Sequence, residues 1–371
     1  MRFVCVSVNQ LTKLISTMNA FDVIVIGGGP AGLVSALLMA RTGKKVAILD
    51  KPAEVNEKVG ESMPATTNRL LKKLDLPLLS QRKHDFIAGS ESYWAGQYEQ
   101  QDFIHHLQGC DWRLDRLQFE SDLHHLAKES GAQFFFDRLS NLYKNPHGWE
   151  LETDEKHTLH ADFIIDASGR SSVLSRHLSL EKEKGEPLVA LWASVEIDDN
   201  SYQSMTTNTL LESQENGWWY AARLPNKKLL VIYHTSASNA GTITKRPSHW
   251  LDELTQTNVL SKHLPLERFI NSKLNANNAR SNRLTTPYGE NWAACGDAAV
   301  SFDPLSSQGL YNAIATAAML HKALQGDNRE SALEKYGQSL ERVAYIYQQK
   351  RQQYYQQAYD HYQTDFWKAH L

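Results

Sequence analysis

The sequence predicts a mixed α/β protein in two parts, one built on a parallel sheet and the other on an antiparallel sheet, closed by C-terminal helices. The first part is indicated by the β-branched run 22–26, which leads into a glycine-rich turn and a helix of small residues. The second part is indicated by 186–236, where apolar and polar residues alternate as in half-buried strands. The 371 residues are long for one compact domain and sufficient for two.

The first part begins with a βαβ unit. Asp22–Ile26 is a strand of the fully buried type, and Leu33–Arg41 is expected to be a helix. Gly43 ends this helix, because glycine readily adopts the left-handed conformation after a helix C-terminus. Residues 45–49 form the second strand, which ends at Asp50.

The remaining elements follow from similar patterns. Apolar spacings of three and four residues predict helices at 117–128, 249–260, 264–274 and 310–324. Short β-branched or aromatic runs predict strands at 134–136, 162–165, 188–197, 218–222, 229–234 and 292–295, with hairpin-like segments at 140–160. A long C-terminal helix is expected to present one aligned face, formed by Leu340, Val343, Tyr347, Arg351, Tyr354, Ala358 and Tyr362.

Composition and charge exclude several classes of protein. Hydrophobic residues make up 42% and charged residues 22%, which rules out a disordered chain. The net charge of −3 gives no general attraction to nucleic acid or to an anionic membrane, and we expect neither as a partner. The apolar stretch 21–40 contains four glycines and a proline, so a membrane helix is not expected.

The cysteines and histidines indicate no disulfide framework and no metal site. The three cysteines are scattered without metal-ligand spacing, a pattern that suits a reducing cytoplasm. The pairs His105-His106 and His124-His125 are adjacent, and neighbouring histidines on a helix point too far apart to chelate one ion.

The first motif that carries chemistry is Gly27-x-Gly29-x-x-Gly32, between the first strand and its helix, with an acid at Asp50. Glycine is needed at the tight turn, at the close approach to a pyrophosphate, and where the helix packs on the strand. The helix N-terminus offers unpaired N–H groups to the phosphates, and Asp50 can accept a hydrogen bond from a ribose hydroxyl. The pattern predicts a Rossmann-type dinucleotide site and does not separate NAD from FAD.

The second motif lies far along the chain and favours FAD. Asp297 ends a strand, where a carboxylate could hold the ribityl hydroxyls of a flavin. Pro304 and Gly309 would bring the backbone close to a flat ring. The helix that begins near Leu310 points its N–H groups at that ring, where they would stabilise the negative charge of a reduced flavin.

Together these motifs resemble the FAD-dependent aromatic hydroxylase superfamily. Asp166-Ala-Ser-Gly169 is similar to that superfamily's middle motif, and Trp112-x-Leu114-x-Arg116 resembles the segment whose arginine reaches the FAD pyrophosphate. The resemblance also assigns Lys51 and Ser62 to cofactor binding. It implies a Rossmann-type FAD-binding domain, an antiparallel substrate domain and C-terminal helices.

Within this superfamily, Gly60-Glu-Ser-x-Pro64 and Gly217-Trp-Trp-Tyr-x-x-x-Leu-Pro225 resemble the branch that contains the flavin-dependent tryptophan halogenases. Halogenases carry W-x-W-x-I-P, and this chain has Tyr220 and Ala222 at the two tryptophan positions. The halogenase catalytic lysine corresponds to Ile87, whereas Lys83 is near but in a different context. These departures favour hydroxylation over halogenation.

A narrower resemblance is to the LodB/GoxB-type flavoproteins, carried by the Gly-Glu-Ser-x-Pro segment, the Trp-Trp-Tyr strand and the Tyr-rich last helix that ends in Phe366-Trp367. It implies a monooxygenase that hydroxylates a tryptophan side chain in the precursor of a partner quinoprotein amino-acid oxidase, during cysteine tryptophylquinone biogenesis. Such a reaction consumes O2 and electrons. The electron donor is unidentified, because the sequence contains no second dinucleotide fingerprint. The alternatives are a small-molecule aromatic hydroxylase or halogenase relative, and a non-catalytic FAD-bearing maturation chaperone.

Trp218 and Trp219 are candidates for the substrate side of the site. They alternate faces on one strand, so one is expected to face the flavin-side cavity while the other packs away. The competing interpretation is that both are core residues. No catalytic acid or base is identified from the sequence.

The predicted domain organisation is discontinuous. It comprises an N-terminal extension at 1–20, an FAD-binding domain from 21–75, 105–184 and 285–325, a substrate domain from 76–104 and 185–284, and C-terminal helices at 326–371.

Overall fold

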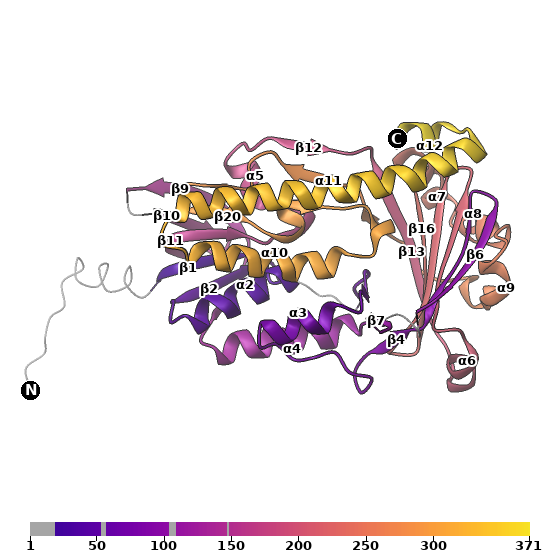
Figure 1. Ribbon diagram of the computed structural model, residues 1–371, viewed down its shortest axis with the longest axis horizontal. Coiled ribbons are helices and arrows are strands. Elements are labelled where there is room, and N and C mark those ends of the chain that lie inside the picture. Colours follow the sequence, from indigo (N-terminus) through magenta and orange to yellow (C-terminus); the bar gives the residue numbers. More distant parts are fainter. Residues whose placement is uncertain (1–18, 53–56, 104–108, 147) are drawn as a thin grey trace, which may run out of the picture.

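The computed structural model describes residues 19–52, 57–103, 109–146 and 148–371, and Figure 1 shows their arrangement. The expected histidine pair at 105–106 and residues 1–18 of the extension expected at 1–20 lie outside these ranges. Among the described residues, no helix is both long enough and apolar enough to cross a bilayer.

The parallel sheet forms one end of the molecule. Its central strands have the order β20-β11-β1-β2-β8, and every neighbouring pair among them is parallel. Their bounds are β1 Ala20–Ile26, β2 Val46–Asp50, β8 Gln133–Phe136, β11 Thr158–Asp166 and β20 Trp292–Ala294. The hairpin of β9 (Leu139–Asn145) and β10 (Gly148–Thr153) pairs with β11, and β19 (Tyr288–Gly289) pairs with β20.

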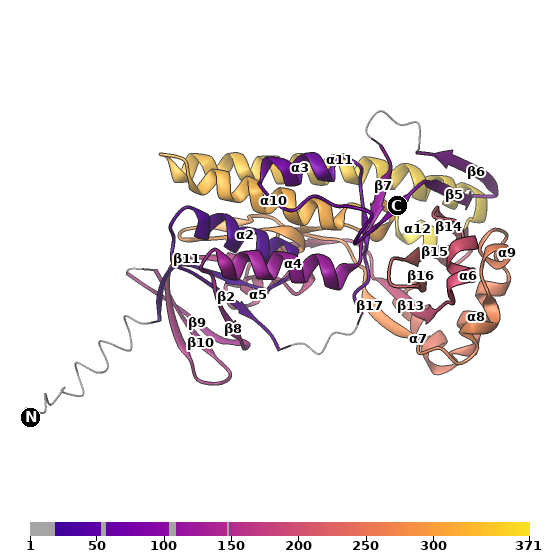
Figure 2. The same cartoon turned by 90° about the horizontal axis from the view of Figure 1, so that it is seen from below.

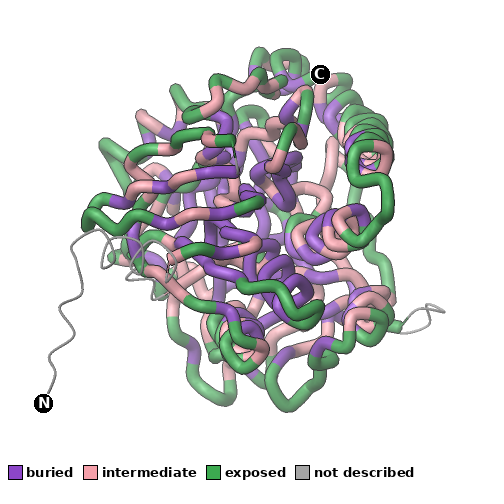
Figure 3. The backbone as a smooth tube through the Cα atoms, turned by 90° about the vertical axis from the view of Figure 1, so that its left-hand side faces the viewer, coloured by how far each residue is buried: buried purple, intermediate pink, exposed green. Residues whose placement is uncertain are grey.

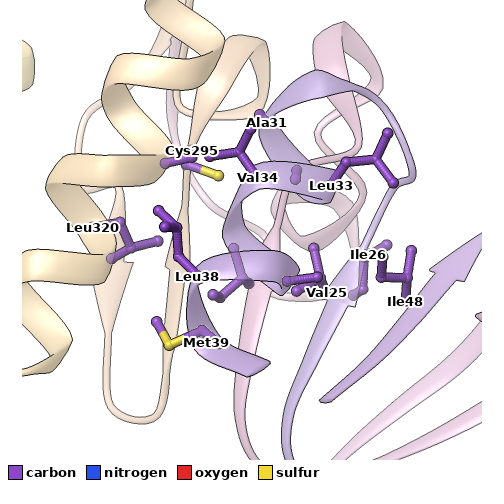
Figure 4. Packing of buried hydrophobic residues seen from close by; sticks show 14 of the residues in the cluster. Val25, Ile26, Ala31, Leu33, Val34, Leu38, Met39, Ile48, Cys295 and Leu320 are labelled. Carbon is purple, nitrogen blue, oxygen red and sulfur yellow. The ribbon is translucent and has the colours of Figure 1, made fainter. Parts of the chain in front are cut away.

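Helix α2 (Pro30–Arg41) is buried between this sheet and other helices. It packs against α4 (Arg116–Glu129) and α10 (Gly309–Leu324), and ten consecutive residues, 31–40, are buried. Figure 4 shows this packing, with Cys295 beside Ala31 and Val34 and with Leu320 of α10 near Leu38. A helix that is apolar on all sides is expected when it is enclosed in this way.

The second sheet has seven strands in the order β17-β13-β16-β15-β14-β5-β6, all antiparallel except for the β14–β5 pair. Their bounds are β5 Gly89–Trp94, β6 Gln97–Asp102, β13 Leu188–Glu196, β14 Thr209–Gln214, β15 Gly217–Leu224, β16 Lys228–Ser236 and β17 Asn275–Asn278. Figure 2 shows the helices α6 (Asp199–Ser204), α7 (Ala237–Lys245), α8 (Ser248–Thr255) and α9 (Leu260–His263) beyond its outer face.

Smaller sheets connect the two parts. β3 (Ser62–Met63) and β4 (Asp85–Ile87) both pair with β7 (Asp111–Arg113). β12 (Lys182–Lys184) and β21 (Val300–Ser301) both pair with β18 (Asn282–Leu284). Of the segment 76–104, therefore, β4 belongs to a small sheet while β5 and β6 extend the seven-stranded sheet.

The long helix α11 (Arg329–Tyr362) runs past both parts, and α12 (Asp365–Ala369) ends over the second sheet (Figure 1). The remaining helices are α3 (Thr67–Lys73) and α5 (Val173–His177). Buried residues concentrate in the middle of the molecule, and exposed ones follow its loops and edges (Figure 3).

Two expected helices are wrong in detail. Residues 264–274 form only a short 3-10 turn at Leu266–Phe269, and the strand β17 begins at Asn275, directly after the expected helix. The helix expected at 249–260 is divided into α8 and α9, because the buried Glu212 carboxylate accepts hydrogen bonds from the backbone N–H groups of Asn258 and Val259. On α11, the expected face is one residue off near its end: Tyr355 is fully buried, whereas Tyr354 is 51% exposed.

Candidate functional site

The first glycine motif is packed so tightly that only glycine fits at two of its positions. Gly27 has φ +108°, and a Cβ there would lie 2.5 Å from the Ala167 carbonyl oxygen. A Cβ on Gly32 would lie 1.8 Å from the Gly27 carbonyl oxygen. The start of α2 thereby lies directly against the residues that follow β1 and β11.

Gly29 differs from these two glycines because a Cβ there would meet no atom within 4 Å. It is the N-cap of α2, no side chain caps this end of the helix, and no acidic residue stands in the first turn. Among the residues that the structure describes, no side-chain acceptor therefore faces the N–H groups of the first turn. Unpaired N–H groups and the helix dipole together favour an anion such as a pyrophosphate.

Asp50 lies beside this turn. A Cβ on Gly28 would come within 2.6 Å of the Asp50 Oδ2, so the half-buried carboxylate is directly next to the glycines. Lys51, which follows it, is exposed. This places an acceptor for a ribose hydroxyl next to the open end of α2.

The second motif is in contact with the first. Gly296 has φ +59°, and a Cβ there would lie 2.8 Å from the Cβ of Ala31 on α2. The Cys295 Sγ is 3.4 Å from the Ser35 Oγ, also on α2, and Gly296 donates its N–H to the Thr316 Oγ1 of α10 at 2.8 Å. The two motifs, which are far apart in sequence, thus meet at the N-terminal end of α2.

Asp297 is surrounded by positive charge. Its Oδ2 is 3.4 Å from the Nε of Arg170, and the charge of Arg116 also acts on it. Desolvation raises the pKa of the Asp297 carboxyl above its ordinary value, although both guanidinium groups act in the opposite direction. A raised pKa means that the ionised Asp297 carboxylate lowers the stability of the fold at neutral pH. Carboxyl groups with shifted pKa values are typical of functional sites.

Arg116 begins α4 and reaches back to the segment before β3. Its Nη1 donates to the carbonyl oxygens of Val59 at 2.8 Å and Gly60 at 2.6 Å, and its guanidinium pairs with Glu120. The guanidinium is thereby held within the electrostatic range of Asp297.

The turn between Pro304 and α10 is the third component of the site. Ser307 adopts a left-handed conformation with φ +51°, and the buried Ser306 Oγ has no hydrogen-bond partner among the described residues. The N-cap of α10, Gln308, makes no side-chain cap, and a Cβ on Gly309 would meet nothing within 4 Å. The N-terminus of α10, including the Leu310 N–H, is consequently free of side-chain acceptors, as an anionic ring would require.

Ser62 occupies a different environment from the one that the sequence suggested. Its Oγ is 3.1 Å from the hydroxyl of Tyr220 and accepts a hydrogen bond from Arg113 Nη1 at 3.2 Å. Arg113 also pairs with Glu61, and the Tyr220 hydroxyl donates to the same Glu61 carboxylate. All these contacts join the small β3–β7 sheet to β15 of the large sheet.

Sequence reasoning missed this Glu61–Arg113–Tyr220 cluster. Glu61 and Arg113 are each only 2% exposed, and their partners lie in three segments of the chain. The sequence pointed to Glu61, in the Gly-Glu-Ser-x-Pro segment, and to Tyr220, at a halogenase tryptophan position. Nothing in the sequence indicated that these two side chains are in contact.

Trp218 and Trp219 point to opposite faces of β15, as alternation predicts, but both are core residues, 1% and 0% exposed. Trp218 stacks on His234 with ring centroids 3.7 Å apart, and Trp219 stacks on Tyr233 at 4.3 Å. Neither indole borders open space in this structure, because the aromatic side chains of the helices α11, α12 and α8 cover them.

A hollow open to solvent separates the two parts beside Arg116. One wall comes from the segment 57–61 and the start of α4, and the other from β13, β15 and β16. Its lining combines apolar and charged side chains and comprises Glu57, Lys58, Val59, Glu61, Leu114, Asp115, Arg116, Leu117, Trp192, Ser194, Leu224, Asn226, Lys228 and Leu230. The Glu57 carboxylate bridges across it to Lys228 and Ser194.

The residues that stand at the halogenase positions do not reproduce a halogenase lysine. Ile87 is buried in β4, 2% exposed, and Lys83 lies at the surface, where it pairs with Asp122 at 2.6 Å.

The fold and the two uncapped helix ends define a protein that binds FAD. Residues 20–350 match the family described as FAD binding domain, and the chain belongs to this family. It is a FAD-dependent oxidoreductase, as the paired glycine motifs predicted.

More particular similarities agree with the resemblance drawn from the motifs. The putative FAD-dependent oxidoreductase LodB of Marinomonas mediterranea is 30% identical over 353 residues, which cover 91% of this chain and 94% of that protein. Among solved structures, the peptidyl tryptophan dihydroxylase QhpG, essential for tryptophylquinone cofactor biogenesis, matches with a TM-score of 0.76 at 19% identity, over 95% of this chain and 78% of QhpG. The flavin-dependent halogenase CmlS matches with a TM-score of 0.80 at 21% identity, over 95% of this chain and 68% of CmlS.

Proposed function

We propose that this oxidoreductase is a monooxygenase that hydroxylates a tryptophan side chain in the precursor of a partner amino-acid oxidase, during tryptophylquinone cofactor formation. The observation that carries the proposal is the near full-length similarity to LodB, together with a fold shared with QhpG. Ile87 at the halogenase lysine position favours hydroxylation over halogenation.

Different residues of the chain would bind different parts of FAD. The open end of α2 and Arg116 hold the pyrophosphate, Asp50 holds the adenosine ribose, and Asp297 holds the ribityl chain. The turn at 304–309 and the N-terminus of α10 face the flavin ring and stabilise its negative charge when it is reduced. Lys51 and Ser62 are further proposed cofactor contacts; Lys51 is exposed beside Asp50, and the Ser62 hydroxyl also accepts a hydrogen bond from Arg113.

When bound, FAD would supply oxygen activation: with two electrons from a donor and two protons, O2 would give one oxygen atom to the aromatic C–H bond and the other to water. The protein orients the ring and excludes water from it.

Co-production with the partner oxidase precursor tests the proposal. The partner's mass should increase by the mass of one or more oxygen atoms relative to the partner produced alone. The same experiment with Asp297→Ala should abolish this gain, whereas Asp360→Ala, on the exposed surface of α11, should leave it unchanged. A partner that gains no oxygen with the wild-type protein would contradict the hydroxylase assignment.

A maturation chaperone is the alternative that the same experiment distinguishes. If Asp297→Ala lacks FAD completely and the partner still acquires its quinone, the protein acts by binding the partner rather than by oxidising it. A free aromatic metabolite that is hydroxylated while the partner remains unmodified would instead favour the small-molecule enzyme.

A further inference from the structure

Asp303 is a buried carboxylate, 3% exposed, at the start of the turn that leads to α10. Its Oδ1 accepts the N–H of Leu305 at 2.9 Å and so caps the 304–306 turn. Its Oδ2 accepts hydrogen bonds from two side chains of α11, Arg351 Nε at 3.2 Å and the Tyr355 hydroxyl at 2.6 Å. One carboxylate thus joins the turn to the C-terminal helix.

The partners of Asp303 lie on consecutive turns of α11. Tyr347, Arg351 and Tyr355 are four residues apart and therefore share a face of the helix. The Tyr347 hydroxyl accepts the backbone N–H of Asp303 at 2.8 Å, so both the backbone and the side chain of Asp303 are held. The pKa of Tyr355 is raised well above its usual value by burial and by the negative charge of Asp303, so this hydroxyl stays a donor.

A second set of contacts holds Phe302, the residue directly before Asp303. The carbonyl oxygen of Phe302 accepts a hydrogen bond from Arg170 Nη2 at 2.5 Å, and Arg170 also contacts Asp297. The ring of Phe302 packs on Tyr347 with centroids 4.2 Å apart. The strained left-handed Ser307 follows, and such a conformation persists only when its surroundings determine it.

Not every polar contact of α11 reaches this turn. Tyr362, near the end of the same helix, donates to the Ser213 carbonyl oxygen at 2.7 Å, a contact that attaches the helix to β14 without reaching the turn. The Asp303 contacts, by contrast, converge on the segment between Pro304 and Gly309, next to the orphaned Ser306 hydroxyl and the uncapped N-terminus of α10.

We propose that Asp303, held by Arg351 and Tyr355, is a positioning residue that sets the 304–309 turn against the flavin ring and thereby tunes the affinity and reduction potential of the bound FAD. The inference rests on the proposed placement of the ring at this turn, and not on the identity of the substrate. Hydrogen bonds to the buried Asp303 carboxylate are strong in a low-dielectric interior, and the packed 304–309 turn has few alternative positions. A small displacement of Asp303 should therefore also displace the turn.

Tyr355→Phe and Tyr362→Phe form a matched pair that tests the proposal, since each removes one hydroxyl from the same helix and keeps the ring. Tyr355→Phe should raise the FAD dissociation constant by about fivefold to tenfold, the order expected for weakening one hydrogen-bonded support of a binding turn. It should also shift the FAD reduction potential and visible absorption spectrum. Tyr362→Phe should leave all three as in the wild type.

Variants of Arg351 add a test by rescue. Arg351→Met should reproduce the effects of Tyr355→Phe, and Arg351→Lys, which keeps a cation near Asp303, should restore most of the wild-type potential. Asp303→Asn is expected to have the largest effect, and the tyrosine pair decides the question if that variant does not fold.

A merely structural role gives a different result. If Tyr355→Phe lowers the unfolding temperature as Tyr362→Phe does, while FAD affinity, potential and spectrum stay unchanged, the positioning role is refuted. Because no partner protein or aromatic substrate is involved, this outcome is independent of whether the tryptophan hydroxylase proposal holds.

Discussion

The contact between the two glycine motifs can be tested by adding a single methyl group at Gly296. Gly296→Ala places a Cβ 2.8 Å from the Cβ of Ala31, whereas carbon atoms in good contact are roughly 3.5–4.0 Å apart. The residue also has φ +59°, a left-handed conformation that costs a non-glycine residue about 1–2 kcal/mol.

The expected destabilisation combines these two contributions. Overpacking of this kind typically costs about 1–3 kcal/mol, so the free energy of unfolding should fall by about 2–5 kcal/mol in total. Ala31→Gly removes the atom that the new methyl group meets. Alone it should cost up to about 1 kcal/mol, as glycine does in a helix.

The assay is urea unfolding of the FAD-free protein, followed by the far-UV circular dichroism. In the double variant Gly296→Ala/Ala31→Gly, the loss of unfolding free energy caused by overpacking should be recovered, which gives a coupling free energy of about 1–3 kcal/mol. The loss caused by the left-handed backbone of residue 296 should remain. Gly241→Ala is the control: a Cβ there meets no atom within 4 Å in α7, so it should stabilise the protein by roughly 0.5–1 kcal/mol. A coupling free energy within about 0.5 kcal/mol of zero would show that the two motifs are not in contact.

Three further predictions concern buried charge. Asp297→Asn should keep or raise the unfolding temperature of the FAD-free protein near neutral pH and weaken FAD binding in a fluorescence titration. Because the folded-state pKa of Asp297 is raised, the wild-type protein loses stability as the pH rises from the ordinary pKa to the raised pKa, and the variant should lack that loss. The same loss in the variant would exclude Asp297 as its cause. Arg113→Met should lower the free energy of unfolding by about 3–5 kcal/mol, since it leaves the Glu61 carboxylate buried without its cation, and adding Glu61→Gln should recover part of this loss; no recovery would count against the ion pair. Burial lowers the pKa of His234 to about 3, so its contribution to the stability of the protein is greatest above pH 6.5, where this histidine is neutral, and is lost as the pH decreases toward 3. His234→Phe should remove about 2 kcal/mol of the loss in unfolding free energy between pH 6.5 and pH 5, measured by urea unfolding at each pH. The same loss of stability at low pH in the variant would contradict the prediction.

The parallel-sheet part was predictable because its signals are local. The run Asp22–Ile26, the glycines after it and the helix to Arg41 each depend on residues within one turn or one strand, and the structure reproduces them within a few residues. The glycines at 27 and 32 were likewise predictable, since their requirement for a missing Cβ follows from the tight turn itself.

Contacts between distant segments were not predictable in this way. The strand β17, directly after the helix expected at 264–274, was not expected either, because its pairing with β13 is a contact between distant segments that no local pattern records. Trp218 appeared to be a substrate-side candidate, but the C-terminal aromatic residues Tyr355 and Trp367 close over it. Burial by a segment more than a hundred residues away leaves no trace in a single sequence.

The sequence by itself determined that the chain has a dinucleotide turn, an acid after the second strand and a second motif suited to a flavin, because the backbone geometry of these turns depends on glycine and on short-range spacing. Only the tertiary structure decided that Ala31 meets Gly296, that Glu61, Arg113 and Tyr220 share one buried cluster, and that α11 holds Asp303. The physical reason is that these contacts are set by how sheets and helices pack, which depends on shape and burial across the whole chain.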